Sequence, residues 1–267
     1  MCIRIVSLSP SATETLSMLG LEDEIVGITP WCSMYLKNAT GKIFAGTYTA
    51  VDTSAIKSLN PDLVILQSHV HDHLLPLFRA LGLNSYLMPL PANLIDIVSN
   101  VEFIATLTSR YWEGKELAES LLEKIIEYMR WSRSTEKRCR VYVEYLWPDR
   151  RVSSAGSLTY VDDGVRVAGA QNIFHSRVAK FFFVSDEEVI ARDPEVVLAN
   201  IEPPYTGVSL DRYLEYRPVL MNTTAYRLRS IYLIEESVEA NLAHPGPSFI
   251  TNTVRRIIDI VKNFRRL

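Results

Sequence analysis

Apolar positions follow two patterns along this chain of 267 residues. Short runs of consecutive apolar residues alternate with stretches in which apolar residues recur every three or four positions. Consecutive apolar runs are typical of parallel strands that helices cover on both faces, so we expect an α/β fold. The expected strands are Ile3–Leu8, Glu24–Thr29, Asp62–Gln67, Arg140–Leu146, Glu195–Ile201 and Ser230–Glu235.

A repeated order of residues indicates that the chain has two similar halves. Pro61 and Asp62 stand directly before one buried strand, and Pro194 and Glu195 stand directly before another. Prolines at such positions are common in α/β proteins. However, the two copies lie about half the chain length apart, which favours twin lobes.

A long amphipathic helix is expected between the halves, at Arg110–Trp131. The stretch lacks proline, and at 1.5 Å per residue it would be about 33 Å long. The predicted organisation is an N-terminal α/β lobe at 1–108, a linking helix at 109–132 and a C-terminal α/β lobe at 133–267. The apolar stripe of this helix is formed by Ala118, Leu121, Leu122, Ile125 and Met129.

Composition excludes several classes of protein. The 28 basic and 31 acidic residues give a net charge of -3 without a basic stripe, so nucleic-acid binding is not expected. No apolar run is long enough to span a membrane. Cys2, Cys32 and Cys139 are widely spaced, which favours isolated thiols over disulfides or a cysteine zinc site.

The N-terminus lacks the apolar stretch of a signal peptide and enters a strand pattern at once. As given, the sequence is that of a cytoplasmic protein, or of an exported protein whose signal has been removed.

The first polar motif lies where the first strand meets a helix. Ser11 and Glu14 have the spacing of a capping box, and Pro10 is suited to the start of a helix. The free backbone N–H groups of a helix start suit polar or anionic ligand groups. A purely structural cap is the alternative.

Several segments together resemble the cobalamin- and iron-siderophore-binding proteins of ABC importers. The opening Arg4–Glu14 and the segment Ile25–Thr29 resemble the start of this family. Leu59–Val64, Val167–Ile173 and Pro245–Pro247 match later elements in order. The resemblance implies two Rossmann-like α/β lobes joined by a single long backbone helix, with a ligand cleft between the lobes.

Ligand recognition in such a cleft would come from aromatic and polar side chains at strand ends. Aromatic faces suit a flat macrocycle. The residues expected to contact the ligand are Ser9, Ser11, Trp31, Tyr48, His69, His71, Trp147, Ser157, Glu202 and Tyr205.

Three histidines fall within five residues after a strand, at His69, His71 and His73. Imidazoles are common metal ligands, and the stretch resembles the HxHxDH motif of metallo-β-lactamase-type hydrolases. It lacks one residue before Asp72, and the glycines that usually follow are absent. A metal-dependent hydrolase is therefore the alternative, beside a silent loop or ligand contacts from His69 and His71.

The resemblance also implies docking to an ABC permease through an exposed glutamate on each lobe. Glu187 matches on the second lobe, whereas Ser54 stands at the first-lobe position, with Asp52 close by. One docking charge is therefore missing or displaced, and a relative that binds its ligand without delivering it is the other possibility.

We therefore expect a non-catalytic protein that requires no cofactor and binds a metal chelate. The family resemblance implies that it is a monomer. A corrinoid such as cobalamin is the first expectation, because the opening segment and the region of Trp31 and Cys32 look more like the corrinoid branch of the family. An iron-siderophore or haem is the alternative ligand.

Overall fold

The computed structural model describes residues 3–47, 50–134 and 137–265, which divide into two compact units. Unit 1 comprises Met1–Pro91, Ile97–Leu122 and His244–Pro247, and unit 2 comprises Ala92–Asp96, Glu123–Ala243 and Ser248–Leu267. Each unit contains a sheet with helices. The expected α/β fold is therefore confirmed.

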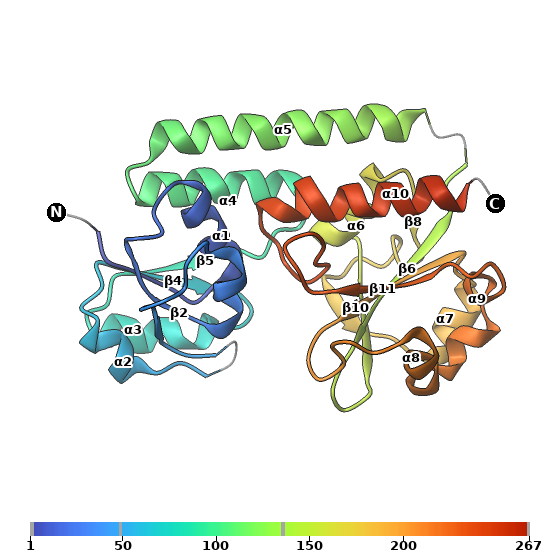
Figure 1. The fold of residues 1–267 in the computed structure, drawn as a ribbon, viewed down its shortest axis with the longest axis horizontal. Coiled ribbons are helices and arrows are strands. Elements are labelled where there is room, and N and C mark those ends of the chain that lie inside the picture. The colour runs from blue at the N-terminus through green and yellow to red at the C-terminus, as the bar shows by residue number, and fades with distance from the viewer. Residues whose placement is uncertain (1–2, 48–49, 135–136, 266–267) are drawn as a thin grey trace. The chain divides into compact units, whose positions relative to one another are not determined.

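Unit 1 is built on a five-stranded parallel sheet in the order β3-β2-β1-β4-β5 (Figure 1). Its strands are β1 (Ile5–Ser7), β2 (Ile25–Ile28), β3 (Ile43–Phe44), β4 (Leu63–Gln67) and β5 (Ser85–Met88). Its helical segments are α1 (Pro10–Met18), the 3₁₀ turns Pro30–Tyr35 and Asp72–Leu74, α2 (Thr53–Ser58), α3 (Leu75–Ala80), most of α4 (Leu94–Leu107) and the first half of α5 (Tyr111–Arg133).

Neighbouring residues of β1 point into two different cores, as the alternation of a strand requires. Ile5 packs in one cluster with Leu16 of α1 and Ile104 of α4. Val6 packs in the other cluster, which contains Ile56 of α2 and Phe78 of α3. Burial on both faces explains why these strands have consecutive apolar residues.

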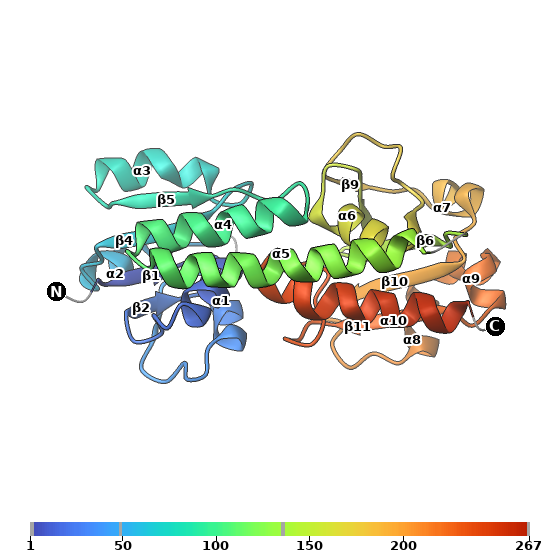
Figure 2. The same ribbon diagram turned by 90° about the horizontal axis from the view of Figure 1, so that it is seen from above.

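The helices α4 and α5 run side by side in unit 1 (Figure 2). Gly114 of α5 lies so close to α4 that a Cβ atom there would be 2.2 Å from the Cβ of Ala105. A side chain at this position would force the helices apart. The predicted long helix is confirmed, with one residue's difference at its start and two at its end.

Unit 2 is built on a six-stranded mixed sheet in the order β11-β10-β6-β7-β9, with β8 paired to β6. Its strands are β6 (Arg140–Leu146), β7 (Val152–Ala155), β8 (Gln171–Asn172), β9 (Phe181–Phe183), β10 (Val196–Ile201) and β11 (Ile231–Glu235). Its helical segments are α6 (Tyr160–Val167), α7 (Asp186–Arg192), α8 (Leu210–Tyr216), the 3₁₀ turn Pro218–Asn222, α9 (Thr224–Arg227), the π-helical turn Phe249–Thr253 and α10 (Val254–Phe264).

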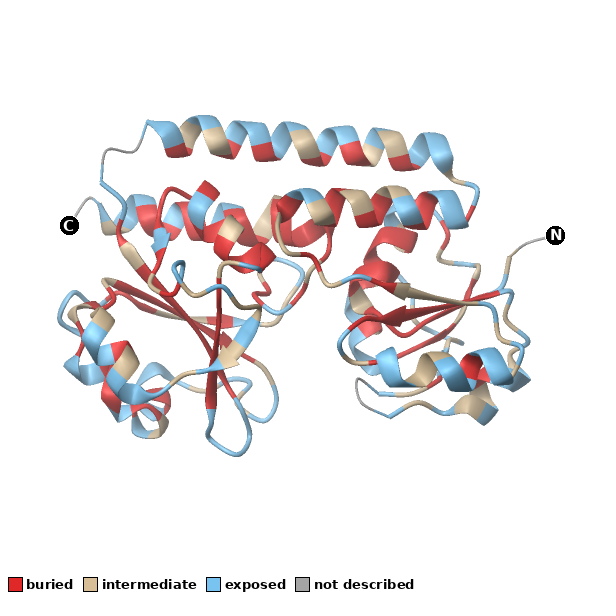
Figure 3. Cartoon of the chain, turned by 180° about the vertical axis from the view of Figure 1, so that it is seen from behind, coloured by how far each residue is buried: buried red, intermediate tan, exposed pale blue. Residues whose placement is uncertain are grey.

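One apolar core of unit 2 lies under α7, α8 and α9. It joins Tyr142 of β6 and Val197 of β10 to Val189, Leu214 and Ala225 of these helices. Figure 3 shows the central strands of both sheets as buried and the outer sides of the helices as exposed. The six strands expected from apolar runs are all present.

The repeated proline–acid order makes the same local structure in both units. In unit 1 the backbone N–H of Arg4 donates to the carboxylate of Asp62, and its guanidinium donates to the carbonyl of Leu59. In unit 2 the N–H of Arg140 donates to the carboxylate of Glu195, and its guanidinium donates to the carbonyl of Asp193. The twin-lobed interpretation is therefore supported by matching hydrogen bonds.

The start of α1 differs from expectation. The N-cap of α1 is Ser9, whose hydroxyl accepts from the N–H of Ala12, so the expected capping box of Ser11 and Glu14 was wrong. Pro10 explains this, because a proline at the first helical position requires the cap to precede it. The last helix, α10, is directly preceded by the π-helical turn Phe249–Thr253.

None of the helices in the part of the chain that the structure describes is long and apolar enough to cross a membrane. Cys32 and Cys139 are free, buried thiols, and burial raises the pKa of both. Cys2 lies outside the described residues.

Candidate ligand-binding site

The residues predicted to bind a ligand mostly follow the carboxyl ends of parallel strands. In unit 1, Ser9 follows β1, Trp31 follows β2 and His69 follows β4. In unit 2, Trp147 follows β6 and Glu202 follows β10. Parallel strands end at a common edge, which is where open α/β sheets bind their ligands.

Ser9 and Ser11 lie in a buried polar network at this edge of unit 1. Their hydroxyl oxygens are 3.1 Å apart, and the hydroxyl of Ser9 donates to Oε1 of Gln67 at the end of β4. The hydroxyl of Thr13 donates to Ser7 at the end of β1. These bonds hold the start of α1 against the ends of β1 and β4.

The three histidines take different positions in the turn after β4. His71 is fully buried, and its Nδ1 accepts from the backbone N–H of Gln67. His69 is exposed, has a φ of 71° and donates its backbone N–H to Asp72. His73 is also exposed. Within residues 3–47, 50–134 and 137–265, no group of three or more His, Cys, Asp or Glu residues is placed to hold a metal ion.

Trp31 lies in the 3₁₀ turn after β2 and is 37% exposed. Tyr48 lies outside the described residues. Trp31 therefore offers an exposed aromatic face at the carboxyl edge of this sheet.

A buried pair joins α1 to a distant part of the chain within unit 1. Nε2 of His244 is 2.7 Å from a carboxylate oxygen of Glu14, and the ring of Tyr35 stacks on His244 with centroids 3.9 Å apart. A Cβ atom on Gly246 would be 2.2 Å from that oxygen. The His244–Pro247 segment therefore anchors α1.

Trp147 and Tyr205 lie together at the carboxyl edge of the sheet in unit 2. The Tyr205 hydroxyl donates to the carbonyl of Trp147, and Nε1 of Trp147 donates to the hydroxyl of Ser153. These bonds fix the indole while leaving Trp147 48% exposed.

The structure adds two aromatic residues that the sequence analysis missed. Phe183 is 49% exposed, and its ring centroid is 6.2 Å from that of Trp147. Phe181 is also exposed and meets Tyr145 edge to face. The signal in the sequence was the run of three phenylalanines at Phe181–Phe183. This run forms β9, which pairs with β7, and β7 pairs with β6, so the phenylalanines come to lie beside the end of β6.

Two carboxylates also meet at this edge of unit 2. Glu202 follows β10 and Glu236 follows β11, and these strands are parallel neighbours with Ile201 opposite Glu235. Burial, followed by the charge of Glu202, raises the pKa of Glu236 to about 7. Burial also raises the pKa of Glu202. The sequence did not point to Glu236, because only the pairing of β10 with β11 places it beside Glu202.

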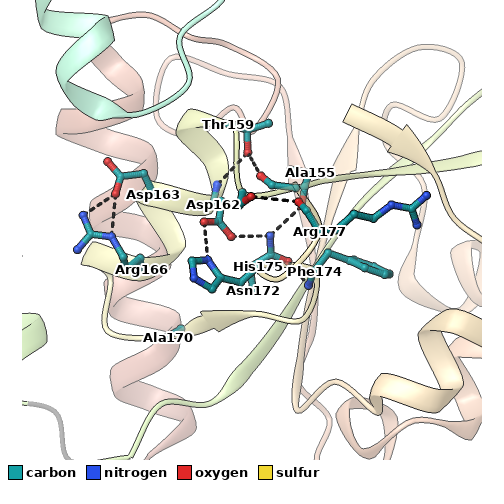
Figure 4. Close-up of polar contacts among 12 residues, drawn as sticks. Ala155, Thr159, Asp162, Asp163, Arg166, Ala170, Asn172, Phe174, His175 and Arg177 are labelled. Atoms are coloured by element: carbon teal, nitrogen blue, oxygen red, sulfur yellow. Dashed lines mark hydrogen bonds and ion pairs between the residues drawn. The ribbon is translucent and has the colours of Figure 1, made fainter. Parts of the chain in front are cut away.

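Ser157 is used inside a turn, because its hydroxyl donates to the carbonyl of Arg177. A nearby polar cluster is shown in Figure 4. There Nδ1 of His175 is 2.9 Å from the buried carboxylate of Asp162, which also accepts from the side chain of Asn172. This cluster fixes the start of α6 to the segment after β8, and it gives His175 a structural partner that the sequence did not reveal.

Glu187 is exposed in the first turn of α7. Its own backbone N–H and the Ser185 hydroxyl lower the pKa of its carboxyl, so it is ionised. Ser54 is exposed in the first turn of α2, and Asp52 caps that helix by accepting from the N–H of Ala55. The carboxylate of Asp52, two positions before Ser54, is thus engaged in a helix cap.

The model of one protein family, described as "Periplasmic binding protein", matches residues 5–238. The chain therefore belongs to the periplasmic binding protein family. This is a family of substrate-binding proteins. Members bind small-molecule metal chelates and serve ABC transporters.

Among curated relatives of this periplasmic binding protein, a "Cobalamin-binding protein" of Halobacterium salinarum is 23% identical over 257 residues. That match covers 94% of this chain and 68% of the relative. A "Vitamin B12-binding protein" of Vibrio parahaemolyticus is 24% identical and covers 98% of this chain and 89% of the relative.

Solved structures share the fold. The apo form of the periplasmic haem-binding protein RhuT from Roseiflexus sp. RS-1 has a TM-score of 0.85 at 25% identity, with coverage of 100% of this chain and 99% of that chain. The periplasmic vitamin B12-binding protein BtuF of Vibrio cholerae has a TM-score of 0.79 at 20% identity, with coverage of 99% and 98%. The two-lobed fold class expected from the sequence is thus confirmed.

Proposed function

We propose that this periplasmic binding protein binds a corrinoid of the cobalamin type, without catalysis, for uptake by an ABC transporter. The observation that carries the proposal is the exposed indole of Trp147, held at a strand end beside Phe183. Fixed aromatic faces suit a large flat macrocycle. The curated relatives that span nearly the whole chain are named for cobalamin and vitamin B12.

Isothermal titration of the purified protein with cyanocobalamin tests this function. We expect saturable binding of one ligand per chain with a dissociation constant of about 1 μM or tighter, which corresponds to about -8 kcal/mol. Absence of heat, together with absence of a spectral change in the ligand, would contradict the corrinoid proposal.

Replacing Trp147 by Ala should weaken cyanocobalamin binding by about tenfold or more. The change removes an aromatic face and its hydrogen bond to Ser153, and truncation of a central aromatic contact costs over 1 kcal/mol. Trp112→Ala is the matched control, since Trp112 is 75% exposed and lies on the helix α5. Equal affinities of the two variants would exclude Trp147 from the binding surface.

Haem is the second candidate ligand, because the similarity to RhuT is the strongest of the structural matches described above. Titration with haem under the same conditions compares the two ligands directly. Tighter binding of haem than of cyanocobalamin would make haem the first candidate ligand.

Delivery to a permease is part of the same proposal. Glu187 is an ionised, exposed side chain at a helix start, where it could meet a basic surface of the permease. The first unit offers Ser54 at the corresponding position, so we propose that docking relies more on unit 2.

A further inference from the structure

Glu202 directly follows Ile201, and Glu236 directly follows Glu235. The two preceding residues are paired across β10 and β11. Ile201 of β10 lies opposite Glu235 of β11, and the N–H of Glu236 donates to the carbonyl of Ile201. The two carboxyl-bearing residues therefore leave adjacent parallel strands at the same edge as Trp147.

Each of these carboxylates is met by a neutral amide. Nδ2 of Asn200 is 3.4 Å from Oε1 of Glu202, and Nδ2 of Asn241 is 3.3 Å from Oε1 of Glu236. Their amide partners are themselves fixed, since the Asn200 side-chain oxygen accepts from the N–H of Leu242 and the N–H of Asn241 donates to Thr253.

The groups that act electrostatically on the pair are acidic or neutral. Glu202 acts on Glu236 and on the buried phenol of Tyr145, and each effect raises a pKa. Glu235 accepts the N–H of Gly207, and Glu239 is exposed in the following loop. None of the ion pairs that the structure gives for the described residues joins Glu202 or Glu236 to a Lys, Arg or His. Negative charge is therefore concentrated here without a basic partner in those pairs.

We propose that Glu202 and Glu236 select ligands that present N–H groups at this edge, such as the primary amides of a corrinoid, and reject ligands that present carboxylates there, such as the propionates of haem. This inference rests on the proposed function. It assigns to the two glutamates the choice between two macrocycles of similar breadth.

The physical reason is that the glutamate carboxylates accept hydrogen bonds from N–H groups but repel other carboxylates. A carboxylate accepts an N–H donor in a charge-assisted hydrogen bond. A ligand carboxylate brought to the same place meets like charge, and the repulsion is stronger where water is partly excluded. Specificity then comes from an element that repels the wrong ligand as well as from contacts to the right one.

The test compares cyanocobalamin with its separated b-, d- and e-monocarboxylic acids, in each of which one primary amide is replaced by a carboxylate of nearly the same shape. At about pH 8 we expect the wild-type protein to bind at least one of these acids about tenfold more weakly than the parent, a difference of about 1.4 kcal/mol. The double variant Glu202→Gln, Glu236→Gln should narrow this ratio to about threefold or less. Glu239→Gln, an exposed acid of the same loop, should keep the wild-type ratio.

The ratio should also shrink in the wild-type protein at about pH 6, because the pair then holds a proton while the ligand carboxylate stays ionised. Equal binding of all three acids and the parent by the wild-type protein would overturn the inference and leave the corrinoid function standing. An unchanged ratio in the double variant, shown by circular dichroism to be folded, would also overturn it. Failure of the parent itself to bind would overturn the function and the inference together.

Discussion

Replacing Arg217 by Met should lower the free energy of unfolding by about 3–5 kcal/mol, the usual cost of leaving a buried charge without its partner. Arg217 is 5% exposed, and Glu144 in the central strand β6 is fully buried. Nε and Nη2 of Arg217 each lie 3.0 Å from an oxygen of Glu144, and Nη1 donates to Asp186 at the start of α7.

The expected loss is large because, among the ion pairs of the described residues, the carboxylate of Glu144 is paired with Arg217. Besides Arg217, the hydroxyl of Tyr213 donates a hydrogen bond of 2.6 Å to Glu144. Burial, followed by the charge of Glu144, raises the pKa of this phenol well above its usual range, so Tyr213 stays neutral. Burial alone would lower the pKa of Arg217, but Glu144 and the bond to Asp186 outweigh it, so Arg217 stays charged.

Urea unfolding followed by circular dichroism measures this effect. Arg212→Met is the matched control, because Arg212 and its partner Glu215 are both mostly exposed, and an exposed pair contributes less than about 1 kcal/mol. The double variant Arg217→Met, Glu144→Gln should recover much of the loss, since it removes the charge that was left unpaired. A loss for Arg217→Met no larger than that of the control would contradict the role assigned to this pair.

The strands that are buried on both faces were predicted correctly from the sequence. β4 (Leu63–Gln67) and β10 (Val196–Ile201) are fully buried and read as continuous apolar runs. β7 has the polar sequence of Val152–Ala155, and β9 is a partly exposed edge strand. Neither is an apolar run buried on both faces. β7 is stabilised by its pairing with β6, and β9 by its pairing with β7.

The candidate site was predictable where a residue directly follows a recognised strand, as Trp147 and Glu202 do. It was not predictable where the partner is set by tertiary structure. Glu14 and His244 are 230 positions apart, and their spacing in the sequence carries no signal. Glu236 likewise acquires its neighbour only through the pairing of β10 with β11.

Replacing Glu236 by Gln should stabilise the protein above neutral pH and leave it nearly unchanged in acid. The pKa of Glu236 is about 7 in the folded protein, against an ordinary value of 4.5, because of burial and the neighbouring charge of Glu202. Below about pH 4.5 the carboxyl is protonated in both the folded and the unfolded chain, so it costs nothing. Between about pH 4.5 and 7 the folded state alone holds the proton, and stability falls as the pH rises.

Above about pH 7 the folded state carries the full cost of ionising this group. The full shift would correspond to about 3 kcal/mol, but Glu236 is partly exposed, and solvent screening reduces the expected gain of Glu236→Gln to about 1–2 kcal/mol. Unfolding free energies at about pH 5 and pH 8 measure it, with Glu239→Gln as the exposed control. An equal fall in stability between these pH values in wild-type and Glu236→Gln proteins would show that Glu236 does not carry the proton. If the unfolding free energy falls between these pH values in the wild-type protein but not in Glu236→Gln, Glu236 carries the proton. The negative charge that the proposed ligand selection requires is then present at the higher pH.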